Sequence, residues 1–185
     1  RVFFAGADAN YALERSDERA VAPDHTNSNY KMAMEHFQQL PIPPHQIFRM
    51  KAETEIEKHA KEYEETIIHY LGTHLFDLVM LGVGEDGHTA SLFPNTLALS
   101  EETRLVVANY VPQLNTHRMT LTFPCINKSA RIAIYALGTA KQEIIPQILQ
   151  AAMISPYPTS HIGTPEHQAL WILDGDSSHK LEKLY

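Results

Sequence analysis

A buried strand that ends in a glycine-rich turn constrains the fold more than any other feature of the sequence. Residues 76–81 read FDLVML, an apolar run interrupted only by Asp77, and residues 82–88 read GVGEDGH. A run of this length and composition suits a strand that is buried on both faces of a parallel sheet. The glycines allow a tight turn, so Asp86 and His88 are displayed just beyond the carboxyl end of the strand. In open α/β sheets, ligands bind at that edge.

The rest of the chain alternates between strand-like and helix-like segments. This alternation predicts a doubly wound α/β fold, with a mostly parallel sheet and helices on both faces. Capping residues precede apolar residues at helical spacing, most clearly where Asn27 or Ser28 precedes the segment 29–40. The pattern predicts helices at 29–40, 53–71, 124–128 and 144–149. It predicts strands at 1–6, 11–13, 47–50, 76–81, 103–110, 119–123, 131–137 and 169–173, with a loop at 156–165.

The length of 185 residues suits one α/β domain, 1–185. The chain begins at Arg1, inside a strand-like segment and with no methionine before it. We therefore expect the domain to lack its amino-terminal part. Two strand-like pieces also lie unusually close together before Ser16, which suggests that residues are missing between Asn10 and Ser16.

Charge and composition argue against several classes of partner. The formal net charge is −7, whereas nucleic acids and anionic membranes select for basic surfaces. The sequence has no apolar run of about 18 residues and no signal-peptide pattern, so we predict no membrane span and a cytoplasmic location. Its one cysteine, Cys125, lies in an apolar stretch and favours a reducing compartment. The 11 histidines form no HExxH or Cys/His cluster, so no metal site is predicted.

Ionisable side chains adjoin three of the strand-like segments. His88 is the best candidate for general acid and base catalysis, because the unperturbed pKa of imidazole suits proton transfer near neutral pH. Asp17 or Asp86 can hold the imidazole in one orientation, and the residues alone do not decide between them. Arg118 and Lys141 are the kind of pair that binds a phosphate, Arg through its fork and Lys as a point charge. The alternative for this pair is a surface salt bridge or a solvated strand end.

The glycine loop and several other segments resemble a known family. The string GVGEDGHTASLFP at 82–94 is similar to the signature of the 6-phosphogluconolactonase family, a branch of the glucosamine-6-phosphate isomerase superfamily. The resemblance extends over nearly the whole chain. It includes SDER at 16–19, SNY at 28–30, RMTLT at 118–122, GTAK at 138–141 and the closing segment 157–174.

The resemblance implies a Rossmann-like, NagB-type fold and the hydrolysis of 6-phosphoglucono-1,5-lactone to 6-phosphogluconate in the oxidative pentose phosphate pathway. It implies that the enzyme needs no metal or organic cofactor and that its partner is a phosphorylated sugar lactone. We expect a monomer or a small homo-oligomer. Carried over to the matching positions, the resemblance implies catalytic roles for His88, Asp17 and Asp86. It implies substrate or phosphate binding by Arg19, Arg118, Lys141, Gly84 and Gly87.

One departure and two alternatives accompany this assignment. The family carries an amino-terminal Gly-Gly-x-Thr-Pro loop that also holds the phosphate, and no such string occurs in the sequence. Glucosamine-6-phosphate deaminases share the fold, but their loop continues Gly-His-Ile-Ala-Phe-Asn-Glu-Pro. The segment 89–94 reads TASLFP and has no carboxylate, which favours the lactonase. A non-catalytic sugar-phosphate-binding protein is the other alternative, and the presence of Asp17, His88, Arg118 and Lys141 weighs against it.

Overall fold

The computed structural model describes residues 3–5, 12–14, 16–37, 39–72, 75–151 and 155–181. Its strands are β1 (Phe3–Ala5), β2 (Ala12–Glu14), β3 (Asp17–Arg19), β4 (Val79–Gly82), β5 (Val106–Val111), β6 (Thr116–Leu121), β7 (Ile132–Ala136) and β8 (Leu170–Leu173). Its helices are α1 (Asn29–Phe37), α2 (Ile56–Leu71), α3 (Phe123–Asn127), α4 (Ile144–Leu149) and α5 (Gly175–Ser178). Short 3₁₀ helices include η1 (Pro44–Gln46), η3 (Pro112–Leu114), η4 (Thr139–Lys141) and η5 (Pro158–His161). Of the stretch between Asn10 and Ser16, where missing residues are expected, residues 12–14 form β2, whereas residues 11 and 15 lie outside the described residues.

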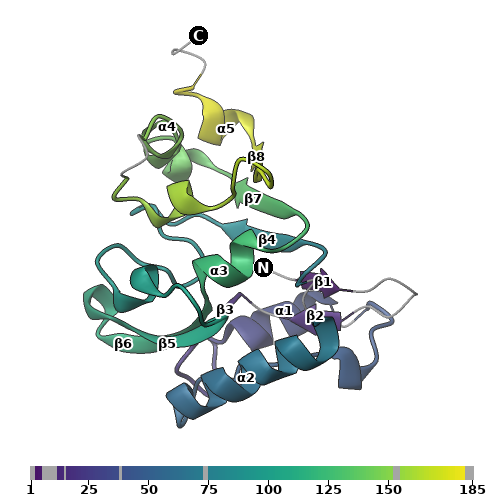
Figure 1. Cartoon of the computed structure of the whole chain (residues 1–185). Helices are drawn as coiled ribbons and strands as arrows, with labels where there is room; N and C mark the ends of the chain where they lie inside the picture. Colours follow the sequence, from purple (N-terminus) through teal and green to yellow (C-terminus); the bar gives the residue numbers. More distant parts are fainter. Residues whose placement is uncertain are drawn as a thin grey trace.

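A parallel sheet carries the glycine loop. Its strands are ordered β4-β7-β8, and both neighbouring pairs are parallel. Val79 and Leu81 of β4, which point to the same face of the sheet, are buried, whereas Met80 on the other face is only partly buried. Figure 1 shows α4 and α5 beside β7 and β8 at one end of the molecule. Because the strands run in one direction, the segments that follow β4, β7 and β8 leave the sheet at the same edge.

A second sheet is antiparallel, with the order β3-β6-β5. β5 and β6 are joined only by η3 and Asn115, a connection too short for the crossover that parallel strands need. Asp17 of β3 lies opposite Thr120 of β6, and Arg19 lies opposite Arg118. The predicted α/β organisation is therefore present, with its parallel pairing concentrated in β4, β7 and β8.

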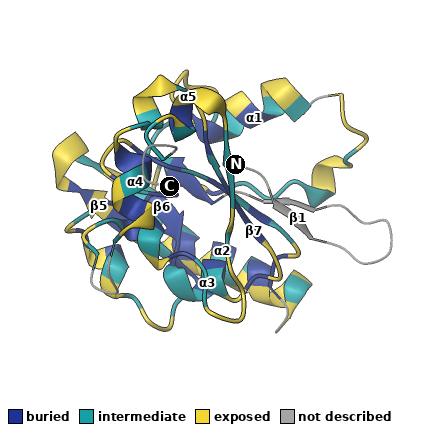
Figure 2. Cartoon of the chain, turned by 90° about the horizontal axis from the view of Figure 1, so that it is seen from above, coloured by how far each residue is buried: buried dark blue, intermediate teal, exposed yellow. Residues whose placement is uncertain are grey.

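The long helix α2 packs against the antiparallel sheet. Its buried residues are Ala60, Tyr63 and Ile67, which recur at helical spacing and so line one face. The helix contacts β5 and β6, and Figure 1 shows it at the opposite end of the molecule from α5. Figure 2 shows the buried residues toward the middle of the molecule and exposed residues on the outer sides of the helices. The predicted helix at 53–71 is confirmed, although it begins at Ile56.

The segment 47–50 forms no strand, so the prediction of a strand there is wrong. Residue 47 makes an isolated bridge, and residues 48–50 belong to no helix or strand. Met50 is fully buried and Phe48 packs against the core. The apolar residues of this segment are therefore explained by the burial of their side chains in the core, without a strand.

A hydrogen-bonded cap joins the ends of β7 and β8. The carboxylate of Asp174, just after β8, accepts hydrogen bonds from the backbone of Ser177 (2.8 Å) and of Gly138 (2.9 Å). These backbone N–H groups, that of Ser177 first, hold the pKa of the Asp174 carboxyl below its usual value. The same turn leads into η4, which ends at Lys141. The cap therefore fixes the turn that positions Lys141.

Candidate active site

The glycine loop after β4 folds into a compact turn. The backbone N–H of Gly84 donates to the carbonyl oxygen of His88 (2.8 Å), and that of Gly87 donates to the carbonyl oxygen of Gly84 (3.1 Å). Gly87 has a φ of +77°, a conformation that side chains with a Cβ rarely adopt. The Thr89 hydroxyl donates to the carbonyl oxygen of Gly82 (2.8 Å) and so ties the far side of the turn to the end of β4. His88 therefore lies at the carboxyl end of β4, as the sequence predicts.

Asp86 supplies the carboxylate that holds His88. The imidazole Nδ1 lies 2.6 Å from Asp86 Oδ1, and the backbone N–H of His88 donates to the same oxygen (3.1 Å). Because a carboxylate accepts, Nδ1 carries the proton in this arrangement and Nε2 is the nitrogen able to accept one. The side chain of His88 is 20% exposed and that of Asp86 is 44% exposed. The pair is thus accessible to a small molecule.

Gly84 leaves the space that this pair occupies. A Cβ built at Gly84 would lie 2.0 Å from His88 Nδ1 and 2.6 Å from Asp86 Oδ1. Any side chain at this position would therefore displace the imidazole or the carboxylate. The geometry explains why a glycine at this point of the loop is needed, independently of any contact with a ligand.

The 3₁₀ helix η5 supports the loop from outside. Thr159 is buried, and both its backbone N–H (3.0 Å) and its hydroxyl (2.8 Å) donate to the carbonyl oxygen of Gly87. A Cβ at Gly87 would lie 2.7 Å from the ring of Tyr157. Sequence reasoning treats 156–165 only as a loop and misses this support. The one available signal is the Tyr-Pro pair at its start, within the closing segment that resembles the family.

Asp17 is buried in the antiparallel sheet, where it meets the chain that follows the glycine loop. Its carboxylate accepts hydrogen bonds from the hydroxyls of Ser91 (2.9 Å) and Ser16 (3.2 Å). Arg118 Nη1 lies 3.9 Å from Asp17 Oδ2. The backbone N–H of Ser91 donates to the hydroxyl of Thr120 on β6 (3.1 Å). Asp17 therefore joins the glycine loop, through Ser91, to the sheet that carries Arg118.

Arg19 lies on the same face of the antiparallel sheet as Arg118, because the two residues are paired across β3 and β6. Its Nη1 donates to the carbonyl oxygen of Asn27 (2.5 Å) and to the side-chain oxygen of Asn29 (3.0 Å). The amide of Asn29 in turn donates to the carbonyl oxygen of Asp17 (3.0 Å). The antiparallel pairing of β3 with β6 thus brings Arg19, Arg118 and Asp17 together. Their proximity does not depend only on strands that end at the same edge of a sheet.

Glu18 is a buried carboxylate that sequence reasoning misses. It accepts hydrogen bonds from the backbone N–H groups of Asn29 and Tyr30 (both 2.7 Å) and from the hydroxyl of Ser28 (3.0 Å). These are donors at the start of α1, which a carboxylate stabilises. Glu18 therefore anchors the helix that follows the Asp-Glu-Arg triplet, and so fixes Asn29 against Arg19.

Lys141 is half-buried in η4, directly after β7. β7 is the parallel neighbour of β4, so η4 and the glycine loop leave the sheet at one edge. Among the residues that the structure describes, the Lys141 ammonium group makes no hydrogen bond or ion pair. Its convergence with Arg118 on a common ligand stays a prediction.

The described residues include no group of three or more His, Cys, Asp or Glu side chains placed to hold a metal ion. In the same part of the chain, no helix is long and apolar enough to cross a membrane.

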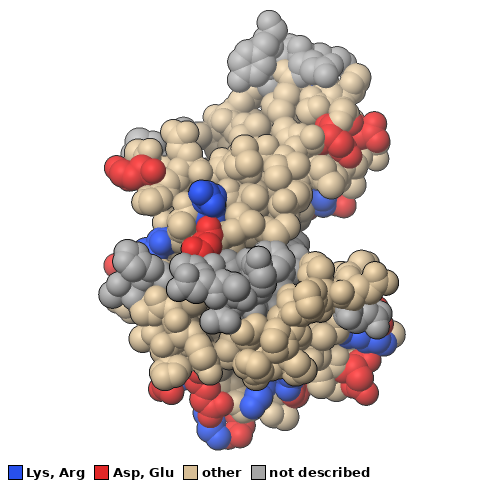
Figure 3. Space-filling model, turned by 90° about the vertical axis from the view of Figure 1, so that its right-hand side faces the viewer, with Lys and Arg blue, Asp and Glu red and all other residues tan. Residues whose placement is uncertain are grey.

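Figure 3 shows acidic and basic side chains interspersed on one face of the molecule. Cys125 is buried, as its apolar neighbours predict.

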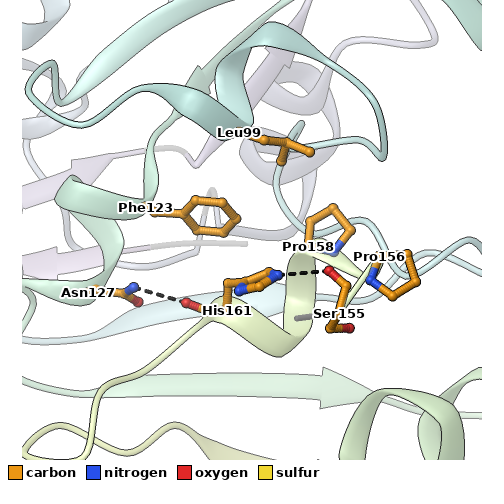
Figure 4. A pocket seen from close by; sticks show the side chains of 7 residues that line it. All are labelled: Leu99, Phe123, Asn127, Ser155, Pro156, Pro158 and His161. Atoms are coloured by element: carbon orange, nitrogen blue, oxygen red, sulfur yellow. Dashed lines mark hydrogen bonds between the residues drawn. The ribbon is translucent and has the colours of Figure 1, made fainter. Parts of the chain in front are cut away.

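A pocket of about 360 Å³ lies beside η5 (Figure 4). Figure 4 shows the His161 imidazole pointing to Ser155, whose carbonyl oxygen lies 3.0 Å from Nε2. The lining contains none of the predicted site residues. It consists of Leu99, Phe123, Asn127, Ser155, Pro156, Pro158 and His161.

Comparison with known proteins decides the family. The model of the family described as glucosamine-6-phosphate isomerases/6-phosphogluconolactonase matches residues 9–171. The chain belongs to this family. It is 46% identical over 160 residues to the 6-phosphogluconolactonase of Chlamydia muridarum, and 33% identical over 171 residues to that of Homo sapiens. These alignments cover 86% and 90% of this chain, and 62% and 66% of the two relatives. The chain thus spans less than two thirds of the length of these relatives.

Similarity to solved structures confirms the NagB-type fold. The crystal structure of the devB protein matches with a TM-score of 0.82 and 35% identity, covering 90% of this chain and 72% of that one. The 6-phosphogluconolactonase from Trypanosoma cruzi matches with a TM-score of 0.78 and 28% identity, covering 90% and 70%. A monomeric glucosamine-6-phosphate deaminase matches with a TM-score of 0.73 and 22% identity, covering 89% and 73%, which shows a shared fold alone.

Proposed function

We propose that the protein hydrolyses 6-phospho-D-glucono-1,5-lactone to 6-phospho-D-gluconate. The observation that carries the proposal is the His88–Asp86 pair at the carboxyl end of β4, in a chain whose family relatives include named 6-phosphogluconolactonases. A hydrogen-bonded imidazole whose other nitrogen can accept a proton is the group that ester hydrolysis needs near neutral pH.

The reaction is the attack of water on an activated ester. As the water oxygen bonds to the lactone carbonyl carbon, Nε2 of His88 takes the proton that the water loses. The bond between that carbon and the ring oxygen then breaks, and His88 returns the proton to the ring oxygen. Asp86 stabilises the imidazolium ion between these two steps. Arg19 stabilises the oxyanion or the phosphate, and Arg118 and Lys141 bind the phosphate.

The alternative activity is that of a glucosamine-6-phosphate deaminase, whose fold the chain shares. The segment 89–94 that follows the catalytic His has no carboxylate, whereas the deaminase pattern carries a Glu there. In this chain Ser91 of that segment instead binds Asp17. The observation favours the lactonase over the deaminase.

Turnover by the full-length protein tests the proposal. We expect rapid hydrolysis of 6-phosphogluconolactone above a no-enzyme blank, and no release of ammonia from glucosamine 6-phosphate. Ammonia release with no lactone hydrolysis would establish the deaminase. Binding of either sugar phosphate without turnover would establish a non-catalytic binding protein.

We further propose that the protein acts in the cytoplasm as a monomer or a small homo-oligomer, without a metal or organic cofactor.

Replacing Arg118 or Lys141 by alanine is expected mainly to raise KM for the phosphorylated lactone. A phosphate is held similarly in the ground state and the transition state, so losing one cation weakens binding more than it slows the chemical step. Initial rates on 6-phosphogluconolactone and on unphosphorylated gluconolactone measure the effect, which should be small for the second substrate.

Arg131→Ala is the matched control, because Arg131 is an exposed cation at the amino end of β7, opposite Lys141. Its KM should equal that of the wild type. Equal losses on both lactones in Arg118→Ala would contradict the phosphate assignment. Such losses would show that the Arg118 guanidinium acts on the reacting carbonyl group or stabilises the fold.

A further inference from the structure

Phe93 contacts two of the predicted site residues with one aromatic ring. Its ring centroid lies 3.9 Å from that of the His88 imidazole, and the two planes are inclined by only 19°. The Cζ atom of Arg118 lies 5.6 Å from the same centroid, over the ring. Phe93 itself is 5% exposed. The proton-transfer group of the β4 loop and the guanidinium of β6 therefore share one buried aromatic surface.

The chain after the glycine loop is folded so as to return Phe93 to His88. Thr89 and Leu92 form an isolated antiparallel bridge, and the backbone N–H of Leu92 donates to the carbonyl oxygen of Thr89 (2.9 Å). Ser91 lies between these two residues, and its hydroxyl donates a hydrogen bond to the buried carboxylate of Asp17. The ring of Phe93 is thus held by a turn that is itself anchored to the antiparallel sheet.

The ring supplies a restraint on His88 that the hydrogen bond to Asp86 does not supply. A hydrogen bond at Nδ1 fixes where one atom of the imidazole lies, whereas a stacked ring fixes the plane of the imidazole. Asp86 is 44% exposed, so water competes for its carboxylate. A buried ring face is not subject to that competition. The stacked ring and the hydrogen bond therefore restrain different features of the same imidazole, its plane and the position of Nδ1.

The ring of Phe93 also attracts the two positive charges of the site, that of the Arg118 guanidinium and that of the protonated His88 imidazole. The face of an aromatic ring carries negative charge density, which attracts a guanidinium and attracts an imidazole more strongly once it is protonated. The contact with Arg118 places the guanidinium over the ring, in addition to its 3.9 Å contact with Asp17.

We propose that Phe93 is a positioning residue, whose ring sets the plane of the His88 imidazole and the direction of the Arg118 guanidinium. The inference rests on the proposed lactonase activity and adds to it the residue that fixes the relative position of the proton-transfer group and the anion-binding group. Phe93 does not touch the reacting atoms. It acts through His88 and Arg118.

Phe93→Leu and Phe93→Met test the proposal, because both keep an apolar side chain and remove the flat ring. We expect kcat on 6-phosphogluconolactone to fall by about 10- to 100-fold in both variants, the loss expected when a catalytic group is misplaced by about 1 Å. The pH profile of kcat/KM should shift as well, since the surroundings of the imidazole change. Phe93→Tyr keeps the ring and should restore most of kcat and the wild-type profile.

Phe76→Leu is the matched control, since Phe76 is a fully buried phenylalanine of the core outside this stack. It should lower the melting temperature without moving the pH profile. If Phe93→Leu and Phe93→Met keep the kcat and the pH profile of the wild type, or change only as Phe76→Leu does, Phe93 is merely a core residue and the proposal is overturned.

Nitrogen NMR of His88 provides a readout that does not depend on turnover. The wild type should show one neutral tautomer, protonated at Nδ1. Phe93→Leu should show a mixture of the two tautomers, because an imidazole whose plane is no longer held turns away from the Asp86 carboxylate that selects the tautomer. A wild-type protein that hydrolyses no lactone would refute the proposed function. In that case the NMR comparison would still decide whether Phe93 positions His88, and an unchanged spectrum would show that it does not.

Discussion

His88→Ala is expected to lower kcat for 6-phosphogluconolactone by about 10²- to 10⁴-fold, the contribution typical of general acid and base catalysis. The imidazole is hydrogen-bonded to Asp86 through Nδ1, so Nε2 is the nitrogen that accepts the proton. Replacing His88 by alanine removes this nitrogen. KM should change little, because the cations assigned to the phosphate remain. Initial rates with a no-enzyme blank measure both constants, since the lactone also opens in water.

A second histidine provides the control for this substitution. His59 lies on α2 and contacts the carbonyl oxygen of Thr54, so His59→Ala removes an imidazole that has no part in the proposed site. Its kcat should equal that of the wild type. Wild-type turnover in His88→Ala would show instead that solvent or Asp17 acts as the base.

The sequence predicts best the parts of the fold that one strong local signal determines. The apolar run at 76–81 leads to β4, and the glycines after it lead to the turn that displays His88. Boundaries are less well determined where the local signal is polar. β6 begins at Thr116 and not at residue 119, because its pairing with β5 extends the strand through His117 and Arg118. Arg118 therefore lies within the central strand of the antiparallel sheet, between Arg19 of β3 and Asn109 of β5.

The contacts that complete the site join residues far apart in the chain, and no local pattern encodes them. The choice between Asp86 and Asp17 as the partner of His88 depends on backbone geometry, because one Asp86 oxygen meets both Nδ1 and the backbone N–H of His88. The support of Gly87 by Thr159 spans 72 residues. Such contacts are properties of the packed molecule, and their residue types, a threonine and a glycine, are common in any loop.

Gly84→Ala is expected to reduce kcat by about 100-fold or more, although it adds a single methyl group. The new Cβ would lie 2.0 Å from His88 Nδ1 and 2.3 Å from its Cε1, far inside van der Waals contact. Gly84 has no positive φ, so its backbone conformation is open to alanine and the clash must be relieved by moving the imidazole. The bond to Asp86 is then lost, while the rest of the fold has no reason to change.

Steady-state rates and thermal unfolding, measured on the same preparations, separate this effect from a loss of stability. Gly175→Ala is the control, because a Cβ at Gly175 meets no atom within 4 Å and should leave both quantities at wild-type values. We expect Gly84→Ala to keep a melting temperature close to that of the wild type while losing most of its turnover. Wild-type kcat in Gly84→Ala would mean that the reaction does not need His88 where the loop holds it, and the assignment of His88 as the proton-transfer group would fail with it.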